Sequence, residues 1–329
     1  MKKRREEKTY MYAVAQIVRP RLFIKKLLRR VLGCMITGIS YMVSPPRKAD
    51  AKYYASICAI FRDEDRYLKE WIEFHLIIGI DHFYLYNNFS SDNYLEVLRP
   101  YIDKGLVTLI DWPVENGQLS AYRDCIANYS EENNWIGFID LDEFVVPNQF
   151  DNIKEFLQQY RRHAAVLLYW RYFGTSGILE RNESNLVVED FTVCWPKYAN
   201  IGKCFYNTDF EFDSEYYEGR YKYLHHLFWG RYKSIHFPPV NVFHKHVLFN
   251  DHCIPSSEVP VQINHYLLKS YKEYVDRKTK KGGGTHGPEM HDMEYFNYRE
   301  MRCQSVDYHA YKYLIRLKLA MRDENGIDN

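Results

Sequence analysis

From residue 53 onward, short apolar runs alternate with longer stretches of helical periodicity. The apolar runs predict strands at residues 57–61, 82–86, 106–110 and 135–139. Between these strands, the periodic stretches predict helices at residues 65–79, 93–102 and 119–128. Strands and helices that alternate at this spacing predict an α/β fold, in which helices cover both faces of a mostly parallel sheet. Ligands of such sheets bind beyond the carboxyl ends of the strands.

Polar turns follow three of the predicted strands, at residues 62–65, 87–92 and 140–143, and should meet at one edge of the sheet. The third turn contains Asp140 and Asp142 directly after an apolar run. On an extended chain these two carboxylates would project together, while Leu141 would point back to the core. Such a pair can hold a hard divalent cation that keeps positions open for phosphate oxygens. A cation that neutralises a departing diphosphate suits glycosyl transfer.

The Asp-x-Asp motif is short, and a second copy stands at Asp63 and Asp65. That copy precedes a predicted helix, whose N-terminus favours acidic residues through the helix dipole. Only the copy at Asp140 and Asp142 directly follows a predicted strand. We therefore assign the metal site to Asp140 and Asp142.

The N-terminal segment has a different character from the rest of the chain. Residues 1–30 hold 11 Lys or Arg and two acidic residues, and their apolar positions predict a basic amphipathic helix. The uncharged run at 31–43 is shorter than the roughly 20 apolar residues that cross a bilayer. Docking on an anionic membrane face, packing on the protein body and an uncleaved signal anchor remain the alternatives. A linker is expected at residues 44–47.

The composition is that of an ordinary globular protein. Its 44 basic and 43 acidic side chains give a net charge of +1, so no overall field attracts nucleic acid. The seven cysteines are scattered and form no C-x-x-C pair, which argues against a disulfide framework or a zinc knuckle. Six histidines between residues 225 and 252 make a separate zinc site a minor alternative.

Six blocks carry a family resemblance over about residues 53–283. They are residues 62–71 with Glu73 and His75; 79–88; Gln118 with 121–125; 140–144; Trp170 with 173–177; and 264–266 with Lys269 and Ser270. In order and spacing they resemble glycosyltransferase family 92 and its bacterial relatives among the family 2-like GT-A enzymes. The resemblance implies a GT-A fold, inversion at the anomeric carbon, a UDP-sugar donor, and Mn²⁺, or alternatively Mg²⁺, as cofactor. The expected acceptor is a glycan or glycolipid.

The resemblance also implies roles for single positions. Arg62, Asn88 and Arg123 stand at donor-binding positions, Asn88 where family 2-like enzymes place an Asp. His265 and Lys269 resemble the late His and Lys that complete the metal shell and grip the diphosphate. A helical turn between them would place both side chains on one face.

Inversion requires a carboxylate that takes the proton of the acceptor hydroxyl. Glu189 and Asp190 resemble the acidic pair that supplies this base in many GT-A enzymes, and Asp190 is our choice. Glu180 and Asp307 remain rivals, because the sequence does not settle the assignment.

Three parts are expected: a basic segment with its linker at 1–50, a GT-A catalytic domain at 51–290, and a helical extension at 291–329. In the extension, a helix over 308–322 should pack on the core, and the glycines within 280–285 indicate a loop that is either a lid or a linker. The sequence therefore predicts a glycosyltransferase of the hexosyltransferase class in the cytoplasm, peripheral to the inner membrane face where the N-terminal helix docks. A non-catalytic sugar- or nucleotide-binding relative and a metal-dependent nucleotidyl- or phosphotransferase are the alternatives.

Overall fold

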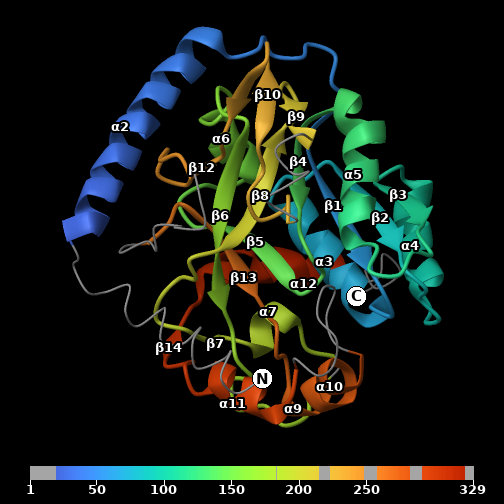
Figure 1. Ribbon diagram of the computed structural model, residues 1–329. Coiled ribbons are helices and arrows are strands. Elements are labelled where there is room, and N and C mark those ends of the chain that lie inside the picture. The colour runs from blue at the N-terminus through green and yellow to red at the C-terminus, as the bar shows by residue number, and fades with distance from the viewer. Residues whose placement is uncertain (1–19, 183, 215–222, 248–257, 282–290, 323–329) are drawn as a thin grey trace. The chain divides into compact units, whose positions relative to one another are not determined.

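The computed structural model describes residues 20–182, 184–214, 223–247, 258–281 and 291–322 (Figure 1). The chain divides into two compact units, Met1–Val43 and Ser44–Asn329. Helix α2 (Pro20–Val43) is the described element of the first unit. Several of its apolar side chains are exposed, namely Leu27, Leu28, Val31, Leu32 and Met35. Within the described residues, no helix combines the length and the apolar character that a bilayer span needs.

A nine-stranded sheet forms the centre of the second unit, in the order β3-β2-β1-β4-β8-β6-β13-β5, with β12 beside β6. Its strands are β1 (Tyr53–Phe61), β2 (His82–Asn87), β3 (Val107–Asp111), β4 (Asn133–Phe138), β5 (Glu143–Pro147), β6 (Ala165–Tyr172), β8 (Gly202–Asn207), β12 (Val240–Asn241) and β13 (Val261–His265). β8 runs antiparallel to β4 and β6, and β5 antiparallel to β13, whereas the other pairs are parallel. The predicted α/β fold of the GT-A kind, with a mostly parallel sheet, is confirmed.

The second unit also contains helices, including the three that the sequence predicts between its strands. They are α3 (Asp65–Ile77), α4 (Tyr94–Asp103), α5 (Gln118–Tyr129), α6 (Ile153–Gln158), α7 (Val187–Asp190), α9 (Tyr271–Glu273), α10 (Thr279–Lys281), α11 (Met293–Glu300) and α12 (Leu314–Met321), with 3-10 turns η1 (Ser130–Glu132) and η4 (His309–Tyr313) and a π-helical turn η2 (Tyr274–Lys278). Helices α3, α4 and α5 connect the parallel strands β1 to β4 and lie beside them (Figure 1).

The C-terminal elements pack on the core. The rings of Tyr313 and Phe74 meet edge to face at 5.5 Å, and Leu314 and Leu317 of α12 are buried. The predicted C-terminal helix is therefore present and packed on the body, although its first turn is 3-10 rather than α-helical. Small strands complete the second unit: β9 (Glu211–Phe212), β10 (Gly230–Tyr232) and β11 (Ile235–Phe237) pair together, and β7 (Val193–Cys194) pairs with β14 (Ser305–Val306).

Buried polar contacts fasten helix α3 to strand β5 and to the turn before it. Burial lowers the pKa of His75 to about 3, so its ring stays neutral, and Nε2 accepts a hydrogen bond from the Val145 backbone N–H at 3.2 Å. The indole N–H of Trp71 donates to the backbone oxygens of Glu143 at 2.8 Å and of Asp140 at 3.2 Å. Hydrogen bonds from α3 thus hold the backbone of the polar turn at residues 140–143 in place.

Three local expectations were wrong. The predicted turn at residues 140–143 is present, but its backbone is not extended as assumed for Asp140 and Asp142, because the Glu143 backbone N–H donates to the Asp140 backbone oxygen at 3.0 Å. Lys269 is not on a helical turn with His265: its φ is +54°, and α9 begins only at Tyr271. Lys280 belongs to α10 rather than to the predicted loop, and residues 282–285 lie outside the described part.

Candidate functional site

The pairing of β13 with β5 brings distant parts of the chain together. In this antiparallel register His265, the last residue of β13, lies opposite Glu143, the first residue of β5. The next residue, Tyr266, donates its backbone N–H to the backbone oxygen of Asp142 at 2.8 Å. Backbone pairing, rather than side-chain attraction, therefore places His265 beside the acidic turn.

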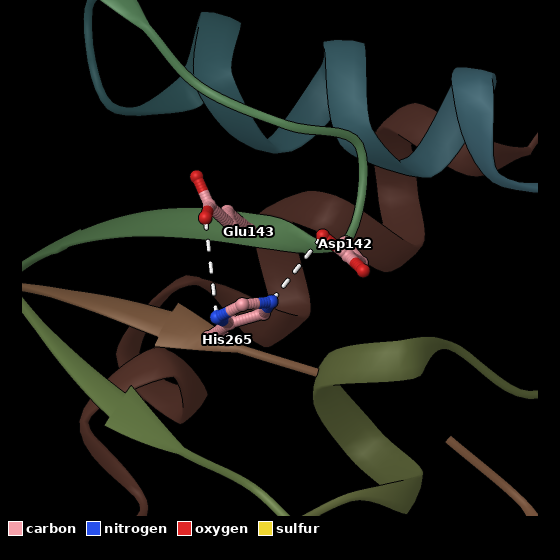
Figure 2. Close-up of side chains that lie close together, drawn as sticks. All are labelled: Asp142, Glu143 and His265. Atoms are coloured by element: carbon pink, nitrogen blue, oxygen red, sulfur yellow. Dashed lines mark ion pairs between the residues drawn. The ribbon is translucent and has the colours of Figure 1, made fainter. Parts of the chain in front are cut away.

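Asp142, Glu143 and His265 converge at this point (Figure 2). The His265 ring lies between the two acids, with Nε2 at 3.6 Å from Asp142 Oδ1 and Nδ1 at 3.9 Å from Glu143 Oε1. One ligand atom from each residue lies within 4.8 Å of the others. Glu143 Oε1 and His265 Nδ1 are buried and have no hydrogen-bond partner within the described residues. This set of two carboxylates and one imidazole fits a divalent cation such as Mn²⁺ or Mg²⁺.

Asp140 is held on the other side of the turn. Its Oδ2 lies 2.7 Å from the ammonium of Lys203, and its Oδ1 accepts hydrogen bonds from the Tyr122 hydroxyl at 2.8 Å and the Gln118 amide at 3.0 Å. Lys203 comes from β8, is fully buried, and also lies 3.6 Å from Glu143 Oε2. The side chain of Asp140 remains 31% exposed, so the carboxylate still faces the open side of the site.

The buried charges shift one another's protonation. Burial alone would lower the pKa of Lys203, but the carboxylates of Asp140 and Glu143 outweigh it and raise that pKa. Burial raises the pKa of Glu143 well above its usual value, which Lys203 only partly offsets. Burial likewise would raise the pKa of Asp142, but Lys278 and His265 overcome it and hold that pKa well below the ordinary value. Burial lowers the pKa of His265, which favours the neutral imidazole that binds metals.

A cationic group faces the acidic turn from the π-helical turn η2. Lys278 Nζ lies 3.1 Å from Asp142 Oδ2. Its neighbour Arg277 donates to Glu64 Oε1 and to the Asp63 backbone oxygen, each at 2.7 Å. Arg277 therefore anchors η2 on the loop after β1, while Lys278 reaches the candidate metal ligand.

Lys269 lies in the same cationic group. Its ammonium sits 3.2 Å from the centroid of the Tyr67 ring and 3.9 Å from Glu64 Oε2. Burial lowers its pKa to about 8, so the side chain still carries a proton for most of the time at neutral pH. Cations placed beside an acidic metal site suit a ligand that carries phosphates.

The other predicted donor-binding residues lie around the neighbouring strand ends. The Asn88 amide donates to the backbone oxygens of Trp112 at 2.7 Å and Val114 at 2.9 Å, which ties the end of β2 to the loop after β3. Arg62 is exposed and stacks 5.7 Å from the Phe89 ring, and Arg123 is exposed on α5. Within the described residues, none of these three forms an ion pair or hydrogen bond with the acidic turn.

The first two candidate bases belong to α7. Asp190 pairs with Arg181, whose Nε lies 3.1 Å from Oδ2, and accepts from the Asn185 amide at 2.8 Å. Its side chain is 8% exposed. Glu189 forms an ion pair with Lys318 of α12.

The rival bases occupy different surroundings. Glu180 is 67% exposed and forms an ion pair with Lys272. Asp307 accepts a hydrogen bond at 3.0 Å from Gln262 of β13. Gln262 and His265 are three residues apart on this strand, so their side chains point to opposite faces of the sheet. Because alternate side chains of a strand point to opposite faces, Asp307 lies across the sheet from His265.

Sequence reasoning missed three side chains of the site: Glu143, Lys203 and Lys278. Glu143 directly follows the acidic motif, so its position was a usable signal. The sequence contains no signal for Lys203 or Lys278, because strand pairing brings Lys203 to the site and the π-helical turn brings Lys278.

The histidine-rich stretch supports no separate zinc site in the portion that the structure describes, where Asp142, Glu143 and His265 form the one cluster of three metal-ligating side chains. His252 lies outside that portion. His226 packs on Trp170 at 5.0 Å between ring centroids, and Trp170 packs on His265 at 4.8 Å. His226 is therefore connected to the candidate site through the Trp170 ring.

Comparison with known proteins places the chain in a family. The family model described as glycosyltransferase family 92 matches residues 51–307. A family 92 protein of Ricinus communis is 30% identical over 139 residues, which are 41% of this chain and 25% of the relative. One of Oryza sativa subsp. japonica is 36% identical over 90 residues, 27% of this chain and 15% of the relative.

Two further proteins are similar over part of the chain. A beta-1,4-galactosyltransferase of Caenorhabditis elegans is 30% identical over 109 residues, which are 29% of this chain and 26% of that protein. The chain thus spans well under half the length of these relatives. Among solved structures, TarS of S. aureus is similar at 10% identity and a TM-score of 0.35, over 57% of this chain and 60% of that one. At that level the likeness transfers no residue roles.

The hydrogen bonds from Trp71 to the acidic turn generate a first prediction. Trp71→Phe should lower the free energy of unfolding by about 1–3 kcal/mol, because it removes the buried indole donor from the Glu143 backbone oxygen and one of the two donors from the Asp140 backbone oxygen. It should also weaken Mn²⁺ binding severalfold, because the turn is no longer held in place. Urea unfolding and Mn²⁺ titration followed by electron paramagnetic resonance measure the two effects.

Trp112→Phe is the matched control for this prediction. The Trp112 indole N–H donates at 3.2 Å to Gly117 O and Ser120 Oγ, away from the acidic turn. Mn²⁺ affinity should therefore be unchanged in that variant. Equal Mn²⁺ affinities in Trp71→Phe and Trp112→Phe would show that the indole does not position the turn.

Proposed function

Because the chain belongs to glycosyltransferase family 92, we propose that it is a metal-dependent glycosyltransferase. It moves a sugar from a UDP-sugar to a glycan or glycolipid acceptor, with inversion at the anomeric carbon. The observation that carries the proposal is the convergence of Asp142, Glu143 and His265 beside the cations Lys269 and Lys278, at the carboxyl ends of the parallel strands.

In this proposal Asp140, Asp142 and His265 would hold Mn²⁺, or Mg²⁺, with Glu143 beside them in the same cluster. A bound divalent cation supplies electrostatic stabilisation to the departing diphosphate. Lys203 keeps Asp140 ionised and in place, and Trp71 fixes the backbone of the turn. The arrangement is thus formed before the donor arrives, which is the condition for effective electrostatic catalysis.

The donor lies along the strand ends in this proposal. Lys269 and Lys278 face the diphosphate, since the Lys278 ammonium pairs with Asp142 and the Lys269 ammonium lies beside Glu64, to which the neighbouring Arg277 is bound. Asn88, which follows β2, Arg62, which follows β1, and Arg123 within α5 are proposed to bind the nucleoside. The beta-1,4-galactosyltransferase among the relatives makes UDP-galactose the first donor to test.

For the transfer itself we propose Asp190 as the base. The acceptor hydroxyl oxygen forms a bond to the anomeric carbon, while the bond from that carbon to the diphosphate oxygen breaks and the diphosphate leaves with the electron pair. The hydroxyl proton passes to the Asp190 carboxylate. In support, Arg181 joins Asp190 to the Tyr67 ring at 5.9 Å, on which Lys269 packs. Glu189 is its neighbour on α7, and Glu180 is the exposed alternative.

We also propose that the N-terminal segment docks on an anionic membrane face from the cytoplasmic side. Its sequence is strongly basic, and α2 exposes a row of apolar side chains. The catalytic domain at 51–290 and the helical extension at 291–329 are proposed as the remaining parts.

The assay that decides the function measures UDP release from a panel of UDP-sugars with Mn²⁺, together with sugar transfer to acceptor glycans. Transfer of the sugar supports the proposal. Transfer of a nucleotide or phosphate would favour the nucleotidyl- or phosphotransferase alternative. Donor binding without any turnover would favour a non-catalytic relative.

The acidic motif generates the second prediction. Asp140→Asn and Asp142→Asn should each lower the transfer rate at least about a hundredfold, because each removes a negative charge that would hold the cation, without changing side-chain volume. Circular dichroism should show an intact fold. The second Asp-x-Asp copy offers matched controls, Asp63→Asn and Asp65→Asn, which should stay active. Full activity in either Asp140→Asn or Asp142→Asn would refute the metal assignment.

A third prediction concerns the base. Asp190→Asn should lower kcat by about a hundredfold or more while donor binding is preserved, as expected when only a transition-state interaction is lost. Glu180→Gln and Asp307→Asn should change kcat little. A large loss of kcat in Glu180→Gln, with Asp190→Asn active, would transfer the role to Glu180.

The fourth prediction tests membrane docking with the full chain. Leu28→Glu should reduce cosedimentation with phosphatidylserine-containing vesicles about tenfold, because it removes apolar burial and adds repulsion from the anionic surface. Leu319→Glu, at a comparably exposed leucine of α12, should leave binding unchanged. High salt should weaken the binding of the natural chain. Equal sedimentation of both variants would exclude docking through α2.

A further inference from the structure

Each carboxylate of the acidic motif already has a lysine ammonium as its counter-ion. Asp140 pairs with Lys203 at 2.7 Å, and Asp142 pairs with Lys278 at 3.1 Å. The second pair involves a candidate metal ligand, because Lys278 holds Asp142 Oδ2 while Oδ1 of the same carboxylate faces His265 in the cluster that fits a cation. A cation bound there and the Lys278 ammonium would compete for the same carboxylate.

The two lysines differ in their freedom to move. Lys203 is fully buried on a central strand and bridges Asp140 and Glu143, so its position is locked. The Lys278 side chain is 25% exposed, at the end of the π-helical turn η2, and its long stem allows the ammonium to swing. π-helical turns are rare in proteins, and those that occur are often found at functional sites.

Arg277 holds the backbone next to Lys278 in place, independently of the position of the Lys278 ammonium. Its guanidinium holds Glu64 in two contacts, at 2.7 Å and 3.1 Å, and also binds the Asp63 backbone oxygen. The loop after β1 and the turn η2 are therefore fastened together. A swing of Lys278 needs no rearrangement of this connection.

Resting on the proposed function, we propose that Lys278 is a built-in counter-ion that makes metal and nucleotide bind together. Without ligands its ammonium neutralises Asp142 and opposes the binding of a divalent cation by repulsion. When a nucleoside diphosphate binds with the metal, the ammonium moves from the carboxylate to a phosphate oxygen. The metal then takes the place of the ammonium at Asp142.

This exchange has a thermodynamic consequence. When Mn²⁺ binds alone, the Lys278 ammonium loses its pairing with Asp142 and gains no other partner. When UDP is also bound, the ammonium pairs with a phosphate oxygen instead. Mn²⁺ should therefore bind weakly alone and more tightly with UDP, and linkage requires UDP affinity to rise by the same factor with Mn²⁺. Couplings of this kind usually amount to a factor of about 5 to 150.

The experiment is a binding cycle with Mn²⁺ and UDP as the probes, followed by electron paramagnetic resonance and calorimetry. In Lys278→Met, which keeps length and removes charge, Mn²⁺ affinity without UDP should rise about tenfold, and the coupling factor should fall correspondingly. In Lys278→Arg, which keeps the charge, the coupling should persist. Thermal unfolding shows whether each variant is folded.

Lys280→Met is the matched control, because Lys280 pairs at 2.9 Å with Asp276, and both side chains are at least half exposed. Its Mn²⁺ affinity and coupling should equal those of the natural chain. Unchanged Mn²⁺ affinity in a folded Lys278→Met, or lost coupling in a folded Lys278→Arg, would overturn the role of Lys278. If the natural chain binds neither Mn²⁺ nor UDP, the proposed function itself fails, which is a different outcome.

Discussion

The site depends on one buried ion pair, that of Lys203 with Asp140. A fully buried ammonium is costly to desolvate, and Lys203 is tolerated on a central strand because Asp140 and Glu143 surround it. The dependence is mutual, since the Lys203 ammonium is the ion-pair partner of Asp140 and also lies 3.6 Å from the fully buried carboxylate of Glu143. Breaking such a pair from one side leaves an uncompensated charge, which typically costs about 3–5 kcal/mol. The conformation of the acidic turn is therefore set by electrostatics as much as by hydrogen bonds.

Backbone pairing supplies the remaining precision. Strand β13 lies between the parallel neighbour β6 and the antiparallel neighbour β5, so His265 faces both Tyr172 and Glu143. A slip of the register by one residue would turn His265 to the opposite face of the sheet. Helix α3 prevents β5 from shifting, because His75 and Trp71 bond its backbone. The imidazole is thus aligned by the backbone of β5, which α3 in turn holds in place.

Much of the fold followed from the sequence, and less of the site did. The alternation of strands and helices up to β4 was correct because its signals are local, in apolar periodicity and in turn residues. The meeting of Asp142 with His265 was expected from family resemblance alone, and its cause is the β13–β5 pairing, which no local pattern reveals. Lys269 was misplaced because a helix was assumed where the backbone has a positive φ. Lys203 could not be predicted, since a lysine within a strand ordinarily indicates an exposed edge.

The site therefore combines a rigid side and a movable side. Lys203, Glu143 and the paired strands are buried and over-determined, and they set where a cation can sit. Lys278, on the π-helical turn η2, is partly exposed and pairs with Asp142. The buried Lys203 ammonium keeps Asp140 ionised, whereas the Lys278 ammonium is free to respond to a ligand. In the proposed exchange, a cation takes over the neutralisation of Asp142 and the released ammonium pairs with the diphosphate, so each ligand lowers the electrostatic cost of binding the other.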